Sequence, residues 1–516
     1  MKTVIDSAFL VFPVNTLGAP KKLSFFDKDQ KVYEISIKLD NINPDFYAFI
    51  DVSRFMGKEL ELSVFPQMDI KYRKTNEIDL EVYNEPLRPQ VHFTTKNGWI
   101  NDPNGMIYID GVYHLFYQHN PADSDWENMQ WGHAVSNDMI HWKEEKVVLF
   151  PDNRGTMFSG SAILDKDNLL GKNTDTNVAA LLFYTTTDPF CQNVSYSTDN
   201  FKTVEHLAAN PVVPNIVGTN RDPKVMYCEE LGCYIMALYL EGDVYGILKS
   251  DNLTDWEEVQ RISIKGDNEC PDIFPLSCAN ENRKWVLMGA HDKYIVGEFR
   301  DGKFVPLQDA LTLTYGCSSY AGQSFNNLPG DRVVRIVWNR WNVPAHTFNG
   351  QMGIPGELAL QKIDGTYYLK CNPINEIESI YNETSTFENV TISKDCEFSK
   401  DLKFVPHLIK LKGDISTSNL VSVRIFGREL KLYASDNKMW LGNDSAPIWI
   451  NGGELDLTIL VDRCSIEIFS DGGKVCVSSL AKHTVADQNL PFITISSNDD
   501  VNIDSLEIIS LNSIWE

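Results

Sequence analysis

Apolar and polar residues alternate at every second position in several stretches of the chain. The alternation runs from Tyr33 to Leu39 and from Leu60 to Val64, and it returns from Leu455 to Asp462 and from Cys464 to Phe469. Side chains of a β-strand point to opposite faces in turn, so this period predicts strands with one buried face. Asp471-Gly472-Gly473 is typical of the hairpin turns that join such strands. Few stretches show the period of a helix, and the pattern predicts an all-β protein.

Three parts of the chain differ in rhythm: a small N-terminal β domain at 1–87, a central domain at 88–365 and a C-terminal β-sandwich at 366–516. In the central part a polar turn recurs as Ser136-Asn137-Asp138, Ser197-Thr198-Asp199 and Ser250-Asp251-Asn252. These turns lie roughly 50 to 60 residues apart, a length that holds about four strands. Repeated four-stranded units are typical of a β-propeller, and the span allows about five blades. An irregular β-sandwich with coincidental turns is the alternative.

The composition restricts the classes of partner. The chain has 516 residues, of which 43% are apolar and 23% charged, as in soluble globular proteins. Its net charge of −25 argues against nucleic acid and against an anionic membrane surface, because both require a basic face. No apolar run reaches the ~18 residues of a membrane span.

The cysteines and the start of the chain predict its compartment. The ten cysteines form no C-x-x-C pair, and no histidine cluster has the spacing of a zinc site. We therefore expect mainly buried thiols, no metal and no organic cofactor. The segment from Met1 to Phe12 is a poor match to a signal peptide. Both features predict a cytoplasmic location.

Three acids stand in turn-like boxes beside proline. They are Asp102 in Trp99-Ile100-Asn101-Asp102-Pro103-Asn104-Gly105, Asp222 in Asn220-Arg221-Asp222-Pro223, and Glu269 in Glu269-Cys270-Pro271-Asp272. In a propeller the innermost strands begin around one central channel, so boxes on different blades converge although they are far apart in sequence. Three carboxylates at one place suit acid/base and nucleophilic chemistry on a neutral substrate.

These boxes resemble the signature motifs of glycoside hydrolase family 32, the family of invertases, levanases and inulinases. Further boxes match in the same order: Phe116-Tyr117-Gln118, Trp131-Gly132-His133, Phe158-Ser159-Gly160-Ser161, Gln323-Ser324-Phe325 and Ile354-Pro355-Gly356-Glu357-Leu358. The resemblance covers roughly 88–516. It implies a five-bladed β-propeller followed by a C-terminal β-sandwich, and it leaves the small N-terminal β domain outside.

The resemblance also implies roles for single residues. Asp102 is the nucleophile, Asp222 the stabiliser of the transition state and Glu269 the acid/base. The implied substrate-binding residues are Asn101, Gln118, Trp126, Phe158, Ser159, Arg221, Tyr320 and Trp338. Since a general acid must be protonated near neutrality, we expect burial and two anionic neighbours to raise the pKa of Glu269.

Two positions depart from the family pattern. Ser318-Ser319 stands where an Asp-Phe pair is common, which leaves one polar wall of the site in question. Gly356 stands where arginine is usual, and we expect a structural ion pair to be loosened there.

The implied function is that of a retaining, exo-acting β-fructofuranosidase that hydrolyses terminal β-fructofuranosyl residues of sucrose, fructooligosaccharides or fructans. Three alternatives stay open: a fructosyltransferase with the same site, an inverting arabinan- or xylan-cleaving propeller with carboxyls about 6.5–9.5 Å apart, and a non-enzymatic carbohydrate-binding propeller. Also open are the preferred linkage, assembly into a homo-oligomer, and whether residues 1–87 shape the leaving-group side of the site, mediate dimerisation or do neither.

Overall fold

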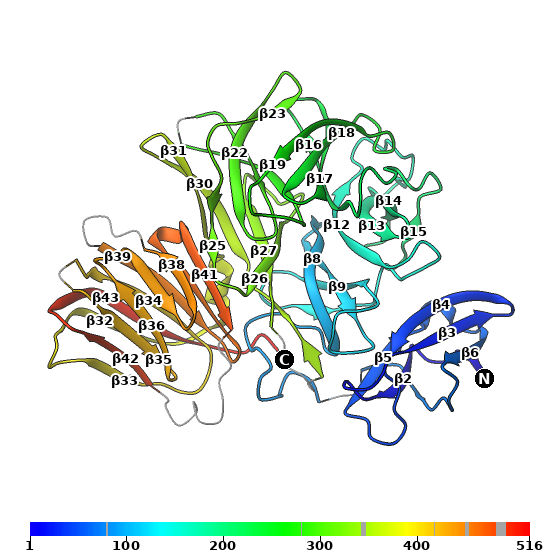
Figure 1. Ribbon diagram of the computed structural model, residues 1–516, viewed down its shortest axis with the longest axis horizontal. Helices are drawn as coiled ribbons and strands as arrows, with labels where there is room; N and C mark the ends of the chain where they lie inside the picture. Colours follow the sequence, from blue (N-terminus) through cyan, green and yellow to red (C-terminus); the bar gives the residue numbers. More distant parts are fainter. Residues whose placement is uncertain are drawn as a thin grey trace.

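Three β-sheet domains follow one another along the chain. A computed structural model describes residues 1–78, 81–279, 281–341, 347–416, 418–448, 454–480 and 492–515. The N-terminal domain and the C-terminal sandwich lie on two sides of a central propeller, at the lower right and the left of Figure 1. The all-β prediction is confirmed. The described helices are short 3₁₀ turns, η1 (Ser53–Phe55), η2 (Asn375–Ile380) and η3 (Asp471–Gly473), and within the described residues no helix is long and apolar enough to cross a membrane.

The N-terminal domain packs two sheets around its own apolar core. The first sheet has the order β1-β6-β3-β4 and the second the order β5-β2-β7. Their strands are β1 (Lys2–Val4), β2 (Phe9–Val14), β3 (Lys21–Asp27), β4 (Gln30–Ile37), β5 (Phe46–Asp51), β6 (Glu59–Phe65) and β7 (Arg73–Thr75). β4 lies at an edge of its sheet, so its outer backbone groups can bond to another part of the chain.

Among the residues that the structure describes, five sheets form the blades of the propeller, and their pairing is antiparallel except for one short strand of the first. The first contains β8 (Gly98–Ile109), β9 (Val112–Asn120), β10 (Gln130–Ser136), β11 (Lys143–Glu144) and β28 (Phe348–Asn349). The second contains β12 (Met157–Leu164), β13 (Ala180–Thr187), β14 (Phe190–Ser197) and β15 (Glu205–His206). The third contains β16 (Arg221–Cys228), β17 (Cys233–Glu241), β18 (Val244–Ser250) and β19 (Glu257–Ser263).

The remaining two blades complete a closed ring. The fourth contains β20 (Asp272–Leu276), β21 (Lys284–Met288), β22 (Lys293–Arg300), β23 (Lys303–Pro306) and β24 (Leu311–Thr312). The fifth contains β26 (Ser319–Ser324), β27 (Val333–Asn339), β29 (Gln351–Met352), β30 (Gly356–Ile363) and β31 (Thr366–Pro373). The first strands of the blades contact one another in the order β8, β12, β16, β20, β26 and again β8. The short strand β28 returns from the fifth blade and pairs in parallel with β8.

The recurring polar turns mark the same place in three blades. Each follows the third strand of its blade, after β10, β14 and β18. In each turn a serine Oγ accepts a backbone N–H: Ser136 from Met139 at 2.8 Å, Ser197 from Phe201 at 2.9 Å, and Ser250 from Leu253 at 2.8 Å. The sequence repeat therefore reflects a repeated turn in which a side chain replaces a missing backbone partner.

The fifth blade extends past the predicted end of the central domain at 365. Its outer strand β31 pairs along its whole length with β30, from Ile363 opposite Thr366 to Gly356 opposite Pro373. Asp364 and Gly365 form the hairpin between two strands of one sheet, so this blade continues to Pro373.

The C-terminal domain is a sandwich of two sheets. The seven-stranded sheet contains β25 (Thr314–Tyr315), β41 (Val475–Leu480), β40 (Ser465–Ser470), β39 (Glu454–Val461), β34 (His407–Asp414), β43 (Val501–Leu511) and β32 (Tyr381–Ile392). The six-stranded sheet contains β33 (Phe398–Asp401), β42 (Phe492–Ser497), β35 (Val421–Ile425), β36 (Arg428–Tyr433), β37 (Lys438–Leu441) and β38 (Asp444–Pro447). The η3 turn joins β40 to β41, as the Asp-Gly-Gly hairpin signal predicted.

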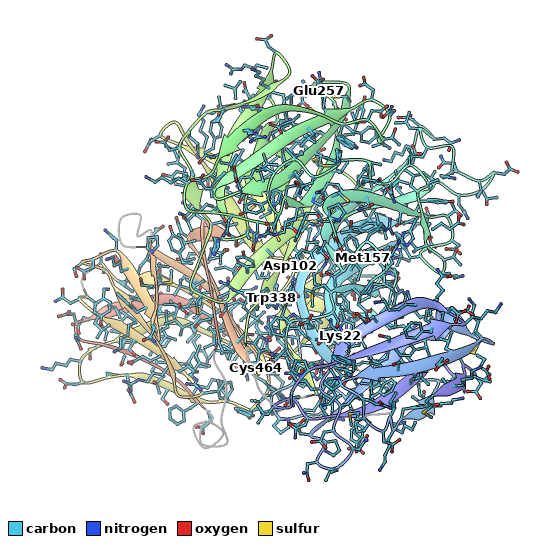
Figure 2. The ribbon with its side chains drawn as sticks, turned by 45° about the vertical axis from the view of Figure 1, so that its right-hand side comes forward. Lys22, Asp102, Met157, Glu257, Trp338 and Cys464 are labelled. Carbon is cyan, nitrogen blue, oxygen red and sulfur yellow. The ribbon has the colours of Figure 1, made fainter. Side chains whose placement is uncertain are left out.

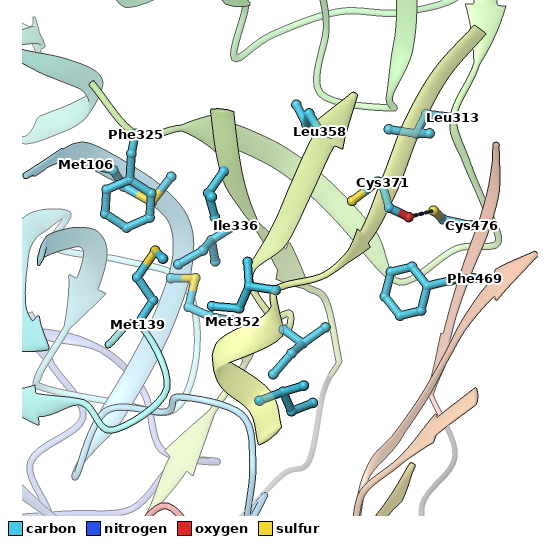
Figure 3. Close-up of a cluster of buried hydrophobic side chains, with 14 of the residues drawn as sticks. Met106, Met139, Leu313, Phe325, Ile336, Met352, Leu358, Cys371, Phe469 and Cys476 are labelled. Carbon is cyan, nitrogen blue, oxygen red and sulfur yellow. Dashed lines mark hydrogen bonds between the residues drawn. The ribbon is translucent and has the colours of Figure 1, made fainter. Parts of the chain in front are cut away.

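One apolar core joins the propeller to the sandwich. This core contains Leu358 and Cys371 of the fifth blade together with Phe469 and Cys476 of the sandwich. In Figure 3 the Cys476 thiol points to the carbonyl oxygen of Cys371, 3.6 Å away. β25 leaves the propeller between the fourth and fifth blades and pairs in parallel with β41 of the sandwich. The two domains therefore share both core and sheet.

A buried ion network reinforces this junction. His92 lies just before the first blade, and its ring nitrogens lie 2.8 Å from Oδ2 of Asp462 and 3.0 Å from Oε2 of Glu467, both in the sandwich. Although burial disfavours the charged ring, the two carboxylates raise the pKa of His92 to about 10. The imidazolium is therefore the form present at neutral pH.

Replacing His92 with alanine is expected to lower the free energy of unfolding by about 3–5 kcal/mol at pH 7, because two buried carboxylates lose a shared partner. A group whose pKa is raised on folding contributes fully below its unfolded pKa, and this contribution is lost as pH rises through about 10. Calorimetric unfolding temperatures at pH 7 and above pH 10 measure both effects. His141→Ala, at a half-exposed His–Asp pair, is the matched control. Equal unfolding temperatures for the two variants would contradict the assignment.

Candidate active site

The innermost strands of the blades are irregular where they begin. Pairing of β8 with β9 shifts between Ile100 and Pro103, and pairing of β16 with β17 shifts between Arg221 and Lys224. The same kind of shift occurs in β12 beside Ser159 and in β26 after Tyr320. A bulge turns side chains away from the regular alternation. Each of these strands can therefore direct neighbouring polar residues toward the axis.

Two of the three acids have a left-handed backbone conformation. Asp222 has a φ of 65°, and Glu269 and Cys270 have φ values of 54° and 38°. Residues with side chains rarely adopt this left-handed conformation, which costs on the order of 1–3 kcal/mol and clusters at functional sites. Both acids lie where the first strand of their blade begins, at β16 and just before β20.

All eleven residues that the sequence predicted for the site line one cavity of about 230 Å³ on the propeller axis. They are Asp102, Asp222, Glu269, Asn101, Gln118, Trp126, Phe158, Ser159, Arg221, Tyr320 and Trp338. Asp102 and Trp338 lie together near the middle of the molecule in Figure 2. Met129 also lines the cavity and was missed, because nothing in its sequence surroundings separates it from a core methionine.

Asp102 is held from one side by a hydroxyl and a thiol. Its Oδ2 accepts a hydrogen bond from Ser159 Oγ at 2.7 Å and lies 3.4 Å from the Sγ of Cys270. Burial raises the pKa of Asp102, and the hydrogen bonds from Ser159 and Asn101 oppose this effect. The carboxylate is thus oriented through one oxygen.

Asp222 shares the Cys270 thiol with Asp102. Its Oδ2 lies 3.5 Å from Cys270 Sγ and accepts the Cys270 backbone N–H at 3.1 Å. Burial raises the pKa of Asp222 to about 7, although the guanidinium of Arg221, 3.7 Å away, lowers it. Cys270 therefore links the two aspartates, and burial raises the pKa of its thiol as well.

Glu269 corrects one expectation. Arg221 forms an ion pair with Oε1 of Glu269, and the Tyr320 hydroxyl donates to Oε2. Burial favours the neutral acid, but these two donors outweigh it and hold the pKa of Glu269 below its ordinary value. The prediction of a raised pKa was wrong for the ligand-free site. The prediction considered the anionic neighbours of Glu269 but not the guanidinium of Arg221, which reaches Glu269 from another blade.

Two polar groups in the cavity wall have no partner among the described residues. They are the side-chain amide of Gln118 and the indole N–H of Trp338. By contrast, the side chain of Asn101 has partners: its Oδ1 accepts the indole N–H of Trp99 at 2.8 Å, and it donates a hydrogen bond to Asp102. Buried polar groups without partners are costly, so the amide and the indole are suited to bind hydroxyl groups of a ligand.

Aromatic rings form the outer rim. Trp126 is 51% exposed and meets Phe158 edge to face at 6.0 Å, and Phe158 meets Phe190 in the same way at 5.9 Å. Exposed rings beside a polar cavity suit stacking against the apolar faces of a sugar.

The two departures from the family pattern lie beside the site rather than in it. Ser319 Oγ lies 3.5 Å from Asp292 Oδ2, and Ser318 is buried; neither lines the cavity. A β-carbon at Gly356 would come within 2.3 Å of Cys371 Sγ. The cysteine therefore fills the space that a larger residue at 356 would need.

A closed propeller with three carboxylates in one small cavity is the arrangement that glycoside hydrolysis requires. The comparisons agree: the model of the "Glycosyl hydrolases family 32 N-terminal domain" matches residues 92–373, and the "Glycosyl hydrolases family 32 C terminal" model matches 428–510. The chain belongs to glycoside hydrolase family 32. Both matches leave residues 1–91 outside.

Similar proteins are fructan hydrolases by name. The chain is 32% identical over 492 residues to a levanase of Bacillus subtilis (strain 168), covering 85% of this chain and 72% of that protein. It is 31% identical to a levanbiose-producing levanase of the same organism, covering 82% and 90%. The crystal structure of an exo-inulinase from Aspergillus awamori superimposes with a TM-score of 0.75 at 25% identity, covering 84% of this chain and all of that one.

Proposed function

We propose that the protein is a retaining, exo-acting β-fructofuranosidase that removes terminal fructose from fructans, fructooligosaccharides and sucrose. The observation that carries this proposal is the convergence of three carboxylates, amides and aromatic rings in one cavity of about 230 Å³. A cavity of this size suits a single terminal sugar ring better than the middle of a polymer. The names of the relatives, levanases and exo-inulinases, support the fructan substrate.

Each acid has a step that its surroundings suit. Asp102, oriented by Ser159, attacks the anomeric carbon of fructose, while Glu269 gives its proton to the departing oxygen. The glycosidic bond breaks and an ester bond to Asp102 forms. Glu269, now a carboxylate, takes a proton from water, and the water oxygen attacks the anomeric carbon and releases Asp102. Asp222 accepts hydrogen bonds from ring hydroxyls, which strengthen as the ring gains positive charge.

Glu269 must carry a proton in the first step, although Arg221 and Tyr320 favour its charged form. Arg221 also lies beside Asp222, so a fructosyl ring bound at Asp222 competes for the same guanidinium. When the bound substrate draws Arg221 away from Glu269, the pKa of Glu269 rises. Glu269 then holds the proton that the first step requires.

Replacing Arg221 with glutamine is expected to move the pH profile of kcat/KM upward on both sides. This profile reports the free enzyme, in which the cation lowers the pKa of both Glu269 and Asp222. Without it, Asp222 ionises at higher pH and Glu269 keeps its proton to higher pH. The value of kcat/KM should also fall about 10- to 100-fold, as expected for the loss of a charged hydrogen bond to substrate. Arg283→Gln, at the half-exposed Arg283, is the control. An unmoved profile would remove Arg221 from this role.

The function is tested by incubating the protein with sucrose, inulin, levan and short fructooligosaccharides and following the products in time. Fructose as the first product from each chain end supports the proposal. A ladder of intermediate oligosaccharides from polymer would show internal cleavage, and new oligosaccharides from concentrated sucrose would show transfer. No release from any of these fructosides would overturn the proposal. The cytoplasmic location stays a prediction.

A further inference from the structure

The loop from Pro121 to Met129, between β9 and β10, carries part of the cavity wall. Trp126 and Met129 both line the cavity, and Trp126 forms its outer rim. The N-terminal domain lies next to this first blade, with β4 and β5 beside it in Figure 1. The domain that both family models leave out therefore lies next to one wall of the site.

A lysine of the N-terminal domain holds the first half of this loop. Lys38 Nζ lies 2.6 Å from Oδ2 of Asp123 and 2.9 Å from Oδ2 of Asp125, which directly precedes Trp126 in sequence. A third bond, to the carbonyl of Thr16 at 2.7 Å, fixes the ammonium group to its own domain. The side chains of Lys38 and Asp123 are 19% and 7% exposed, so solvent screens their attraction weakly.

The second half of the loop is bonded to the edge strand β4. The Ser36 N–H donates to Asn128 Oδ1 at 2.7 Å, and Asn128 Nδ2 donates to the Ser36 carbonyl at 2.7 Å. The side-chain amide thus takes the place of a neighbouring strand. Asn128 Nδ2 also donates to Asn120 Oδ1 at 3.0 Å, which ties the two ends of the loop together.

Trp126 has little burial to fix its position. It is half exposed, and the ring contact that places it is the edge-to-face meeting with Phe158. The flanking Asp123 and Asn128 are both buried and both bonded to the N-terminal domain. Within the propeller, Asn120 Nδ2 and Asn349 Nδ2 also donate to the carbonyls of Asp125 and Ser124, each at 2.8 Å. The segment before Trp126 is therefore held jointly by the first blade and the N-terminal domain.

We propose that Lys38 and Ser36 are positioning residues for Trp126, through which the N-terminal domain sets the affinity for the sugar units beyond the cleaved bond. The proposal rests on the proposed function, because it takes the fructosyl ring to sit among the three acids and the leaving group to extend toward the rim. It assigns residues 1–87 a part in substrate selection, one of the roles that the sequence left open.

Four proteins test this: Lys38→Met, Trp126→Ala, the double variant, and Lys58→Met as the control. Lys58 carries an exposed ion pair to Asp27 in the same domain. Lys38→Met is expected to raise KM for a fructooligosaccharide of three or more units about 5- to 10-fold while kcat stays within about twofold. Sucrose should respond less. In the Trp126→Ala background, Lys38→Met should change KM no further, because coupled residues are not additive.

A second readout does not depend on turnover. Hydrogen exchange of the peptide containing 121–129 should be faster in Lys38→Met than in wild type and unchanged in Lys58→Met. Lys38→Met leaves Asp123 buried without its cation, and the variant could fail to fold for that reason. In that case Asp125→Asn replaces it, because this substitution removes only the half-exposed partner of Lys38. Asp125→Asn should change KM and hydrogen exchange in the same direction but by smaller amounts. The proposal is overturned if hydrogen exchange of this peptide is the same in Lys38→Met as in wild type. It is also overturned if Lys38→Met lowers kcat/KM equally in the wild-type and the Trp126→Ala protein. A wild-type protein that cleaves no fructoside refutes the proposed function instead, while the exchange result still decides whether the domain holds the loop.

Discussion

Asp102→Asn is expected to lower kcat for sucrose and fructooligosaccharides by about 10⁴-fold or more while the protein stays folded. An amide cannot replace the carboxylate as a nucleophile, and removing a nucleophile costs factors of this order in other enzymes. The substitution keeps the size of the side chain, and its amide can still meet Ser159, which now donates to Asp102 at 2.7 Å. The measurement is steady-state release of fructose, with folding checked by the unfolding temperature.

Asp110→Asn provides the matched control for this experiment. Asp110 lies in the hairpin turn that follows β8, the strand that carries Asp102, and has a φ of 47° that asparagine also tolerates. It should keep full activity. Adding methanol to the wild-type reaction tests the role from another side: a retaining enzyme makes methyl β-fructofuranoside and an inverting one the α-anomer. An active Asp102→Asn protein, or the α product, would sink the nucleophile assignment.

Glu269→Gln is expected to lower kcat for sucrose by about 10²- to 10⁴-fold, the usual contribution of general acid catalysis. The effect should depend on the leaving group. A fructosyl fluoride leaves without a proton, so the first step with this substrate should stay near the wild-type rate, measured as a burst of fluoride. Glutamine still offers Arg221 and Tyr320 an acceptor, which preserves the local structure.

Glu257→Gln is the control for the acid. Glu257 lies in β19 of the third blade, well exposed and remote from the axis in Figure 2. Glu257→Gln should leave the rates with sucrose and with fructosyl fluoride unchanged. Equal losses on sucrose and on the fluoride in Glu269→Gln would falsify the proton-donor role and point to a role in positioning alone.

The sequence predicted much of the site because the three acids lie in short, recognisable sequence motifs. Asp102, Asp222 and Glu269 each stand in a turn beside proline, and the polar turns after β10, β14 and β18 reveal the blade repeat. The turns indicated the three acids, and the family resemblance implied the eight other predicted residues; all eleven line the cavity. The roles of the residues stay proposals, but their convergence follows from the ring of first strands.

What the sequence did not predict depends on distances across blades and domains. The ion pair between Arg221 and Glu269 joins residues of different blades, and it reversed the expected direction of the Glu269 pKa. The contact of Lys38 with Asp123 joins two domains that no local pattern connects. Met129 lines the cavity from the same loop, and nothing in its sequence surroundings reveals that position. Such effects require the fold before they can be derived.

The pairing of β28 with β8 carries a consequence for biosynthesis. Phe348 and Gly98 are partners in one sheet, so the earliest blade to leave the ribosome lacks an edge until some 250 residues later are made, and pairings this distant in sequence form slowly. A nascent chain that ends before residue 348 therefore displays an unfinished sheet rim, open to association with other polypeptides. Premature termination or slow translation near this point should favour aggregation over assembly.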